Sequence, residues 1–204
     1  MRILAIETAT EACSVALFDG TKCLAHHHRV MGRGHAEHLV PMISSLPDKG
    51  QAEQIRVSLG PGSFTGVRIG IATARALGVA WNVPVIGYPT MALIAAMTQN
   101  TQPQPVTVCM NGGHGEWFIQ NFDSDAVAQD RVSSLTPQSA KAASQHNIIA
   151  GNRAQDLTAL LGDGRKQVID LLPDARATSL LQPAIFTPDL SPIYGRGPDA
   201  KLPA

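Results

Sequence analysis

The segment best suited to bind a ligand is the glycine-rich turn of residues 60–66, Gly-Pro-Gly-Ser-Phe-Thr-Gly. It separates a predicted strand from a predicted helix, an order that can direct backbone N–H groups at a phosphate. The turn lacks the lysine of a P-loop, its glycines miss the dinucleotide-binding spacing, and it has no Gly-x-Ser-x-Gly. Two interpretations remain: a weak phosphate site using Ser63 and Thr65, or a tight turn in which one of them caps the helix.

Carboxylates are the next candidates for chemistry. Glu7 and Thr8 end the first predicted strand, where two-lobed nucleotide-binding enzymes place an acid for a metal–nucleotide complex. The corresponding turn of the second half carries Asn111, which cannot supply the second negative charge that a divalent cation and phosphates require. We therefore expect Glu7 to be a satisfied polar residue in a turn. Glu7 and Thr8 remain only weak cofactor-binding candidates, and we expect no cofactor.

The histidines and nucleophiles do not form a recognisable site. His35 and His38 can share one face of a helix, but no third ligand is evident. Residues 26–28 are histidines in a predicted strand, so their side chains alternate between two faces and cannot converge. No serine or cysteine is placed by sequence beside a base and its orienting group. We expect no metal site and no catalytic residue.

Composition limits the class of protein. The 204 residues are 44% hydrophobic, enough for a core, and their 16 basic and 16 acidic residues give a net charge of zero. Charged residues make up 16%, against about 25% in an average domain, which suggests that a partner covers part of the surface. The balanced charge argues against a freestanding basic nucleic-acid binder. Three cysteines without a Cys-x-x-Cys pair and no apolar run of about 18 residues predict a cytoplasmic protein without a membrane span.

Hydrophobic patterning predicts an α/β protein built from two similar halves. The first half has the order β-β-β-α-β-α-β-α and ends at the proline-containing segment 101–105. We expect an N-terminal lobe over residues 1–103 and a smaller, more divergent C-terminal lobe over residues 104–204. The predicted strands are 3–8, 13–18, 22–28, 55–59, 83–86, 106–110, 116–122 and 127–132, and the predicted helices are 36–46 (with Pro41 confining its start to nearby residues), 67–82, 90–100 and 137–146.

The helix behind the glycine turn carries a row of small residues at intervals of four: Gly66, Gly70, Ala74 and Gly78. Glycine inside a helix costs about 1 kcal/mol relative to alanine, so close approach of another backbone must compensate. The row either packs on the chain's own sheet or contacts a second protein. Our working hypothesis is the second, and it predicts that Gly70→Leu abolishes pairing while leaving secondary structure intact.

Five segments of the sequence form a recognisable set of motifs. They are Met-Arg-Ile-Leu-Ala-Ile-Glu-Thr-Ala-Thr (1–10), Ala-Cys-Ser-Val-Ala-Leu (12–17), His-Ala-Glu (35–37), Gly-Pro-Gly-Ser-Phe-Thr-Gly-Val-Arg-Ile-Gly (60–70) and Pro-Ile-Tyr (192–194). This set resembles the TsaB (YeaZ) family, whose members help to make threonylcarbamoyladenosine in bacterial tRNA. The resemblance implies an actin-like ATPase (ASKHA) fold of two ribonuclease-H-like lobes, with mixed β-sheets flanked by helices. It also implies a non-catalytic scaffold without a metal site of its own.

The resemblance also implies partners. It predicts a heterodimer with the catalytic subunit TsaD through the first two helices, recruitment of the ATPase TsaE, and contact with tRNA only through the complex. A third, weaker alternative is that the lone chain forms a homodimer through the same helices as an idle state. Arg68 matches a family arginine that can pair with an acid across the interface or lie near nucleotide phosphates. The predicted interface residues are His35, Leu39, Ile43, Gly66, Arg68, Gly70, Ala74 and Gly78.

Four positions depart from the family pattern. Glu7 replaces an aspartate, Ser58-Leu59 replaces Gly-Arg, residues 111–113 replace Asp-Ala-Arg, and residues 194–196 read Tyr-Gly-Arg instead of Tyr-Leu-Arg. These departures leave the fold and the pairing mode standing but weaken the case for a nucleotide in this chain's own cleft. The alternative hypothesis, based on the glycine turn and Glu7, is an autonomous ATPase or phosphotransferase of the same fold.

Overall fold

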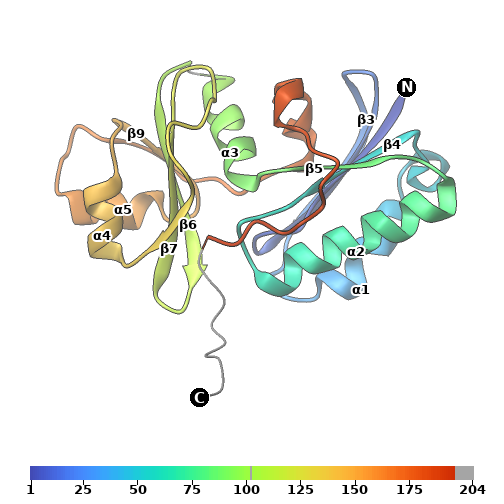
Figure 1. Ribbon diagram of the computed structural model, residues 1–204, viewed down its shortest axis with the longest axis horizontal. Helices are drawn as coiled ribbons and strands as arrows, with labels where there is room; N and C mark the ends of the chain where they lie inside the picture. Colours follow the sequence, from blue (N-terminus) through green and yellow to red (C-terminus); the bar gives the residue numbers. More distant parts are fainter. Residues whose placement is uncertain (102, 196–204) are drawn as a thin grey trace.

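Two five-stranded sheets stand side by side in the computed structural model, which describes residues 1–101 and 103–195 (Figure 1). Each sheet has a central strand with two antiparallel strands on one side and two parallel strands on the other. The predicted doubling of a mixed α/β unit is therefore confirmed. Residue 102 and residues 196–204 lie outside the described part of the chain. The last of the departures from the family pattern, at Arg196, falls among them.

The first sheet is centred on a strand that is buried from Ile3 to Glu7. The predicted hairpin forms between the next two strands of the chain, and its turn at Asp19-Gly20 places Gly20 at a φ of +59°, which glycine adopts readily. The strand order is β3-β2-β1-β4-β5. The strands are β1 (Arg2–Glu7), β2 (Ala12–Asp19), β3 (Lys22–Val30), β4 (Gln54–Ser58) and β5 (Val85–Tyr88).

The second sheet repeats this topology in the order β10-β9-β6-β7-β8. The predicted strand at 127–132 is wrong: the third strand of this meander forms at 133–135, and only Ala128 makes an isolated bridge, to Phe122. The last two strands were not predicted, because three residues are too few to show a period. The strands are β6 (Val106–Gly113), β7 (Glu116–Phe122), β8 (Ser133–Leu135), β9 (Ile148–Ala150) and β10 (Gln167–Ile169).

Helices α1 (His35–Ser44) and α2 (Phe64–Trp81) cover one face of the first sheet and run next to each other (Figure 1). Their apolar residues, among them Leu39 and Ile71, share one core cluster with Leu4 and Val15 of the sheet. The expectation that Pro41 confines the start of the helix to its vicinity is wrong. Helix α1 begins at His35 and continues through the exposed Pro41, which lies inside the helix and removes one of its backbone hydrogen bonds.

Short 3₁₀ turns complete the fold, and three further α-helices pack on the second sheet. Helices α4 and α5 pack on its outer face, and α3 lies between the two sheets (Figure 1). Beyond β10, a 3₁₀ turn (η2) covers the other face of the first sheet, where Ala175 packs against it. Within the described residues no helix is both long and apolar enough to cross a lipid bilayer. These elements are α3 (Thr90–Gln99), α4 (Pro137–Ala143), α5 (Ala154–Leu161), and the 3₁₀ turns η1 (Pro47–Gly50), η2 (Ala175–Leu180) and η3 (Pro183–Ile185).

Candidate functional site

The glycine-rich turn is hydrogen-bonded to the residues that directly follow β1. The Ser63 amide donates a hydrogen bond of 2.7 Å to the Ala9 carbonyl, and the Thr8 hydroxyl donates one of 2.8 Å to the Gly66 carbonyl. The Ser63 hydroxyl in turn accepts the Gly66 amide at 3.2 Å and so caps α2. Of the two interpretations of this turn, the structure supports the cap. Of the weak cofactor candidates here, Thr8 and Ser63 hold the chain's own backbone, and Thr65 is exposed.

The row of small residues on α2 faces inward, onto the first sheet. A Cβ added at Gly66 would overlap the Thr8 carbonyl oxygen, and one at Gly70 would overlap the Thr8 hydroxyl. At Gly78 it would lie 2.5 Å from a methyl group of Val85. The close approach that the row permits is thus between α2 and the chain's own sheet, which corrects the hypothesis that the row meets a partner.

Most of the predicted interface residues are likewise buried inside the chain. His35, Leu39 and Ile43 of α1 and Ala74 of α2 are buried within the chain, and the His35 ring lies 3.2 Å from the Ala12 carbonyl oxygen. Only Arg68 is exposed. A contact through α1 and α2 therefore has to use the opposite sides of both helices.

Those opposite sides expose small apolar residues beside the exposed charged residues Glu37 of α1 and Arg75 of α2. On α2 the exposed alanines recur every four residues, about half a helical turn away from the glycine row, and Val79 beside them is 85% exposed. On α1 the corresponding flank includes Val40, which is 53% exposed. The four-residue spacing of the alanines was a signal in the sequence that we did not use. We call this surface the α1–α2 face, and it consists of Ala36, Val40, Ala72, Ala76, Val79 and Ala80.

An exposed aromatic cluster borders the α1–α2 face at the start of α2. The Arg68 guanidinium lies 3.1 Å from the centre of the Phe64 ring and donates a hydrogen bond of 2.6 Å to the Tyr194 hydroxyl. The segment that carries Tyr194 returns to the glycine turn, because the Ile193 amide donates to the Leu59 carbonyl at 2.8 Å. The Arg68 side chain is thus held in place at the edge of the face, as a charged group at an interface rim would be.

Glu7 is fully buried at the end of β1. One carboxylate oxygen accepts the Ala9 amide at 2.8 Å, and the other lies 3.5 Å from the Thr90 hydroxyl, which is itself 2.5 Å from the Ser58 hydroxyl. Burial raises the pKa of Glu7 to about 7, although the hydrogen bond from Ala9 opposes this. The side chain therefore has the internal, satisfied position that we predicted for it.

Glu7→Gln should remove a pH-dependent loss of stability. Between pH 4.5 and about 7 the folded protein keeps a proton on Glu7 that the unfolded chain has lost, so the stability of the parent falls as pH rises through this window. The variant avoids that fall, which amounts to about 3 kcal/mol. Urea unfolding at pH 4 and pH 8 should show the stability gap between variant and parent widening by about this amount. Parallel pH dependence of the two proteins would contradict the assignment.

The turn of the second half that begins at Asn111 corresponds to the turn at Glu7. Asn152, a residue that our sequence analysis did not identify, connects this turn to the first half by hydrogen bonds. The side-chain oxygen Oδ1 of Asn152 accepts a hydrogen bond of 2.9 Å from the backbone amide of Asn111, and the side-chain NH₂ group of Asn152 donates to both carboxylate oxygens of Glu11 at 3.0 Å. One asparagine thus links the two sheets at the ends of β1 and β6. Across residues 1–101 and 103–195, no three His, Cys, Asp or Glu side chains gather as a metal site would require.

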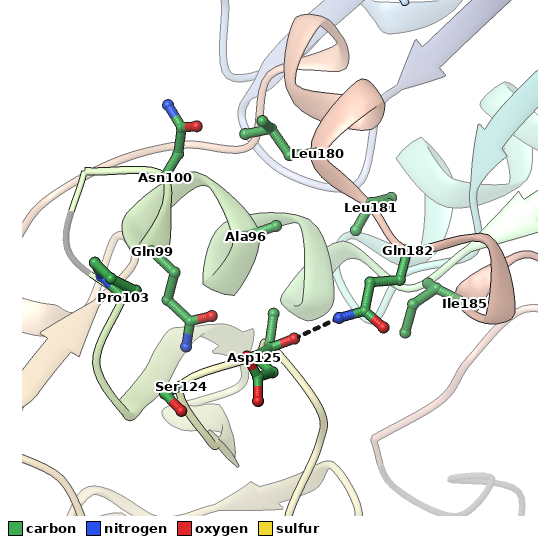
Figure 2. A pocket seen from close by; sticks show the side chains of 11 residues that line it. Ala96, Gln99, Asn100, Pro103, Ser124, Asp125, Leu180, Leu181, Gln182 and Ile185 are labelled. Atoms are coloured by element: carbon green, nitrogen blue, oxygen red, sulfur yellow. Dashed lines mark hydrogen bonds between the residues drawn. The ribbon is translucent and has the colours of Figure 1, made fainter.

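A cavity of about 220 Å³ lies next to α3, and Ala96 of that helix and Leu181 are among the residues that line it (Figure 2). The Gln182 side chain donates a hydrogen bond of 2.9 Å to the Asp125 carbonyl at its rim (Figure 2). No residue that the sequence predicted for a site lines this cavity. The predicted residues instead lie at the end of β1 and on α1 and α2.

Comparison with known proteins identifies the family of this chain. The family model for TsaD, described as tRNA N6-adenosine threonylcarbamoyltransferase, matches residues 27–161, which is more than half of the chain. The chain belongs to this family. Within the family it is similar to the TsaB protein of Escherichia coli, "tRNA threonylcarbamoyladenosine biosynthesis protein TsaB", with 45% identity over 101 residues that cover 47% of this chain and 43% of the relative. The resemblance to TsaB and YeaZ is thereby confirmed.

Solved structures of this family and beyond give the fold. YeaZ from Pseudomonas aeruginosa is 26% identical with a TM-score of 0.72, over 86% of this chain and 87% of that one. The ethanolamine utilization protein EutJ from Carboxydothermus hydrogenoformans, 9% identical with a TM-score of 0.53 over 88% of each chain, shares the fold alone. The predicted actin-like ATPase fold is confirmed. The chain spans about half the length of the curated TsaB relatives that it matches.

Proposed function

We propose that the chain is a non-catalytic partner subunit in tRNA threonylcarbamoyladenosine biosynthesis, and that it binds a TsaD-type catalytic subunit through the α1–α2 face. The observation that carries this proposal is the face itself. Two adjacent helices expose several alanines and valines, with Val79 85% exposed, beside the exposed charges of Glu37 and Arg75. The small side chains allow a helix of the partner to approach closely.

The proposal of a non-catalytic role is supported by the ends of β1 and β6. Glu7 is buried and accepts a backbone amide, and Asn111 has no negative charge to offer a cation. With Thr8 and Ser63 committed to the chain's own backbone, the residues considered for phosphate binding stabilise the fold. In this proposal the transfer chemistry belongs to the TsaD-type subunit, TsaE joins the complex of the two, and tRNA modification depends on the intact complex.

Reconstitution of the complex tests the proposed function. We expect the purified chain to form a one-to-one complex with the TsaD-type subunit of the same organism, and expect tRNA modification by that subunit and TsaE to require the chain. Modification that proceeds equally well when the chain is omitted would refute the proposal.

The alternative function is an autonomous ATPase of the same fold, favoured by the glycine turn at the start of α2 and by the carboxylate of Glu7. Calorimetry of the isolated chain with Mg-ATP separates the two proposals, since tight binding would support the alternative. Light scattering with and without the TsaD-type subunit tests for a homodimer through the same face, because two partners cannot occupy one face at once.

A further inference from the structure

A hollow of about 260 Å³ opens between the edge strand β3 and helix α1. Its lining carries basic groups and no carboxylate: His27 and Arg29 come from β3, and His38 comes from α1. Ser45, just beyond the end of α1, completes the polar part of the wall. This combination of donors is suited to an oxyanion.

Of these groups Arg29 and His38 are free to face such a ligand, whereas Ser45 and His27 bind each other. The Ser45 hydroxyl donates to the Met42 carbonyl at 2.8 Å, so it accepts the hydrogen bond that joins it to His27 Nε2 at 2.9 Å, and this bond orients the His27 ring. In the described part of the chain, the side chains of Arg29 and His38 have neither a hydrogen bond nor an ion pair. Arg29 therefore has a fork of N–H donors available for two oxygens of one phosphate.

Basic residues are concentrated near the hollow although the chain as a whole is neutral, and Glu37, next to His38 on α1, lies outside its lining. No acidic residue occurs between Asp19 and Glu37, a stretch that contains Lys22, Arg29 and Arg33, and five of the seven histidines lie within residues 26–38. Alternation along β3 sends His28 to the other face of the sheet, where it lies 3.6 Å from Asp174. The predicted divergence of the three consecutive histidines is thus confirmed, and the basic groups on the α1 side keep no acidic partner in the hollow.

The hollow and the α1–α2 face lie on opposite flanks of α1. Helical spacing places His38 and Ser45 on the flank toward β3, whereas Ala36 and Val40 lie on the other flank. Helix α1 packs on β2 and α2 packs on β4, which is two strands further from the β3 edge. A subunit bound to the α1–α2 face would leave the hollow open.

We infer that this hollow binds a phosphate of an RNA backbone, and that the chain thereby contacts the tRNA directly rather than only through its partner. The choice of RNA rests on the proposed function, while the choice of a phosphate group rests on the geometry. Arg29 and His38 would bind the phosphate oxygens, and Lys22 and Arg33 extend the basic edge toward neighbouring phosphates.

Fluorescence anisotropy of the full chain with a labelled tRNA transcript, between about 50 and 200 mM salt, tests the inference. Arg29→Ala should weaken binding at least about fivefold and lower the slope of log affinity against log salt by about one, as loss of one phosphate contact does. The matched control is Arg165→Ala, which removes the same charge from a side chain that is 91% exposed and paired only with Asp163. It should change neither quantity.

Three results would overturn the inference: no binding of tRNA by the parent chain, equal effects of the two substitutions, or Arg29-dependent binding of inorganic phosphate or ATP without binding of tRNA. In the reconstituted complex, Arg29→Ala should raise the KM for tRNA, leave kcat unchanged and leave pairing with the TsaD-type subunit intact. Because pairing is measured separately, its absence in the parent would refute the proposed function while the anisotropy result would still decide the RNA contact.

Discussion

Ala76→Arg abolishes pairing of the chain with its TsaD-type partner at micromolar concentrations. Ala76 is the middle one of the three exposed alanines that α2 contributes to the α1–α2 face, so an arginine there would place a long, unpaired cation between two closely packed helices. An unpaired charge buried at an interface costs about 2–5 kcal/mol, which weakens the complex by about 30-fold to several thousand-fold. Analytical ultracentrifugation or calorimetry of the mixed subunits measures the loss, and the self-association of the lone chain should fall with it.

The control for this experiment is Ala142→Arg, the same substitution at an exposed position of α4 on the second sheet. Both variants should keep the circular dichroism spectrum and the melting temperature of the parent, because neither side chain is buried in the chain. Equal affinity of Ala76→Arg and Ala142→Arg for the partner would show that the α1–α2 face is not the interface.

Gly66→Ala destabilises the fold. The added Cβ would overlap the Thr8 carbonyl oxygen, and since this is a backbone atom in the loop after β1, neither side can move cheaply. Overpacking of this kind costs about 1–3 kcal/mol, and the better helix propensity of alanine returns at most about 1 kcal/mol at the first turn of α2. We expect a net loss of about 2 kcal/mol, or a melting temperature lower by about 4–8 °C for a chain of this size.

Gly164→Ala is the matched control, since a Cβ at Gly164 meets no atom within 4 Å and the backbone there needs no positive φ. It should melt with the parent. Gly70→Leu extends the test: the original hypothesis was that it prevents pairing and leaves secondary structure intact, whereas contact with the Thr8 hydroxyl now predicts that the variant first loses stability. Parent-like melting of both Gly66→Ala and Gly70→Leu would contradict the inward packing of the row.

Local patterns in the sequence were enough to predict most elements of the first half. The hairpin at Asp19-Gly20, the capped start of α2 and the mixed order of the strands all depend on neighbouring residues or on a clear hydrophobic period. The second half was harder because β8, β9 and β10 have three residues each and are strands only through their pairing with longer ones.

Only the tertiary structure shows which side of each helix packs inside the chain and which side is exposed. The sequence alone was enough to show that α2 carries a row of small residues on one face, because a helical period of 3.6 residues fixes which positions share a face. It could not show which atoms that row meets, since Thr8 lies far away along the chain and comes next to Gly66 and Gly70 only when β1 and α2 pack together. The same holds for the hollow, where histidines at ordinary strand and helix positions become one basic site because α1 lies beside the edge of the sheet.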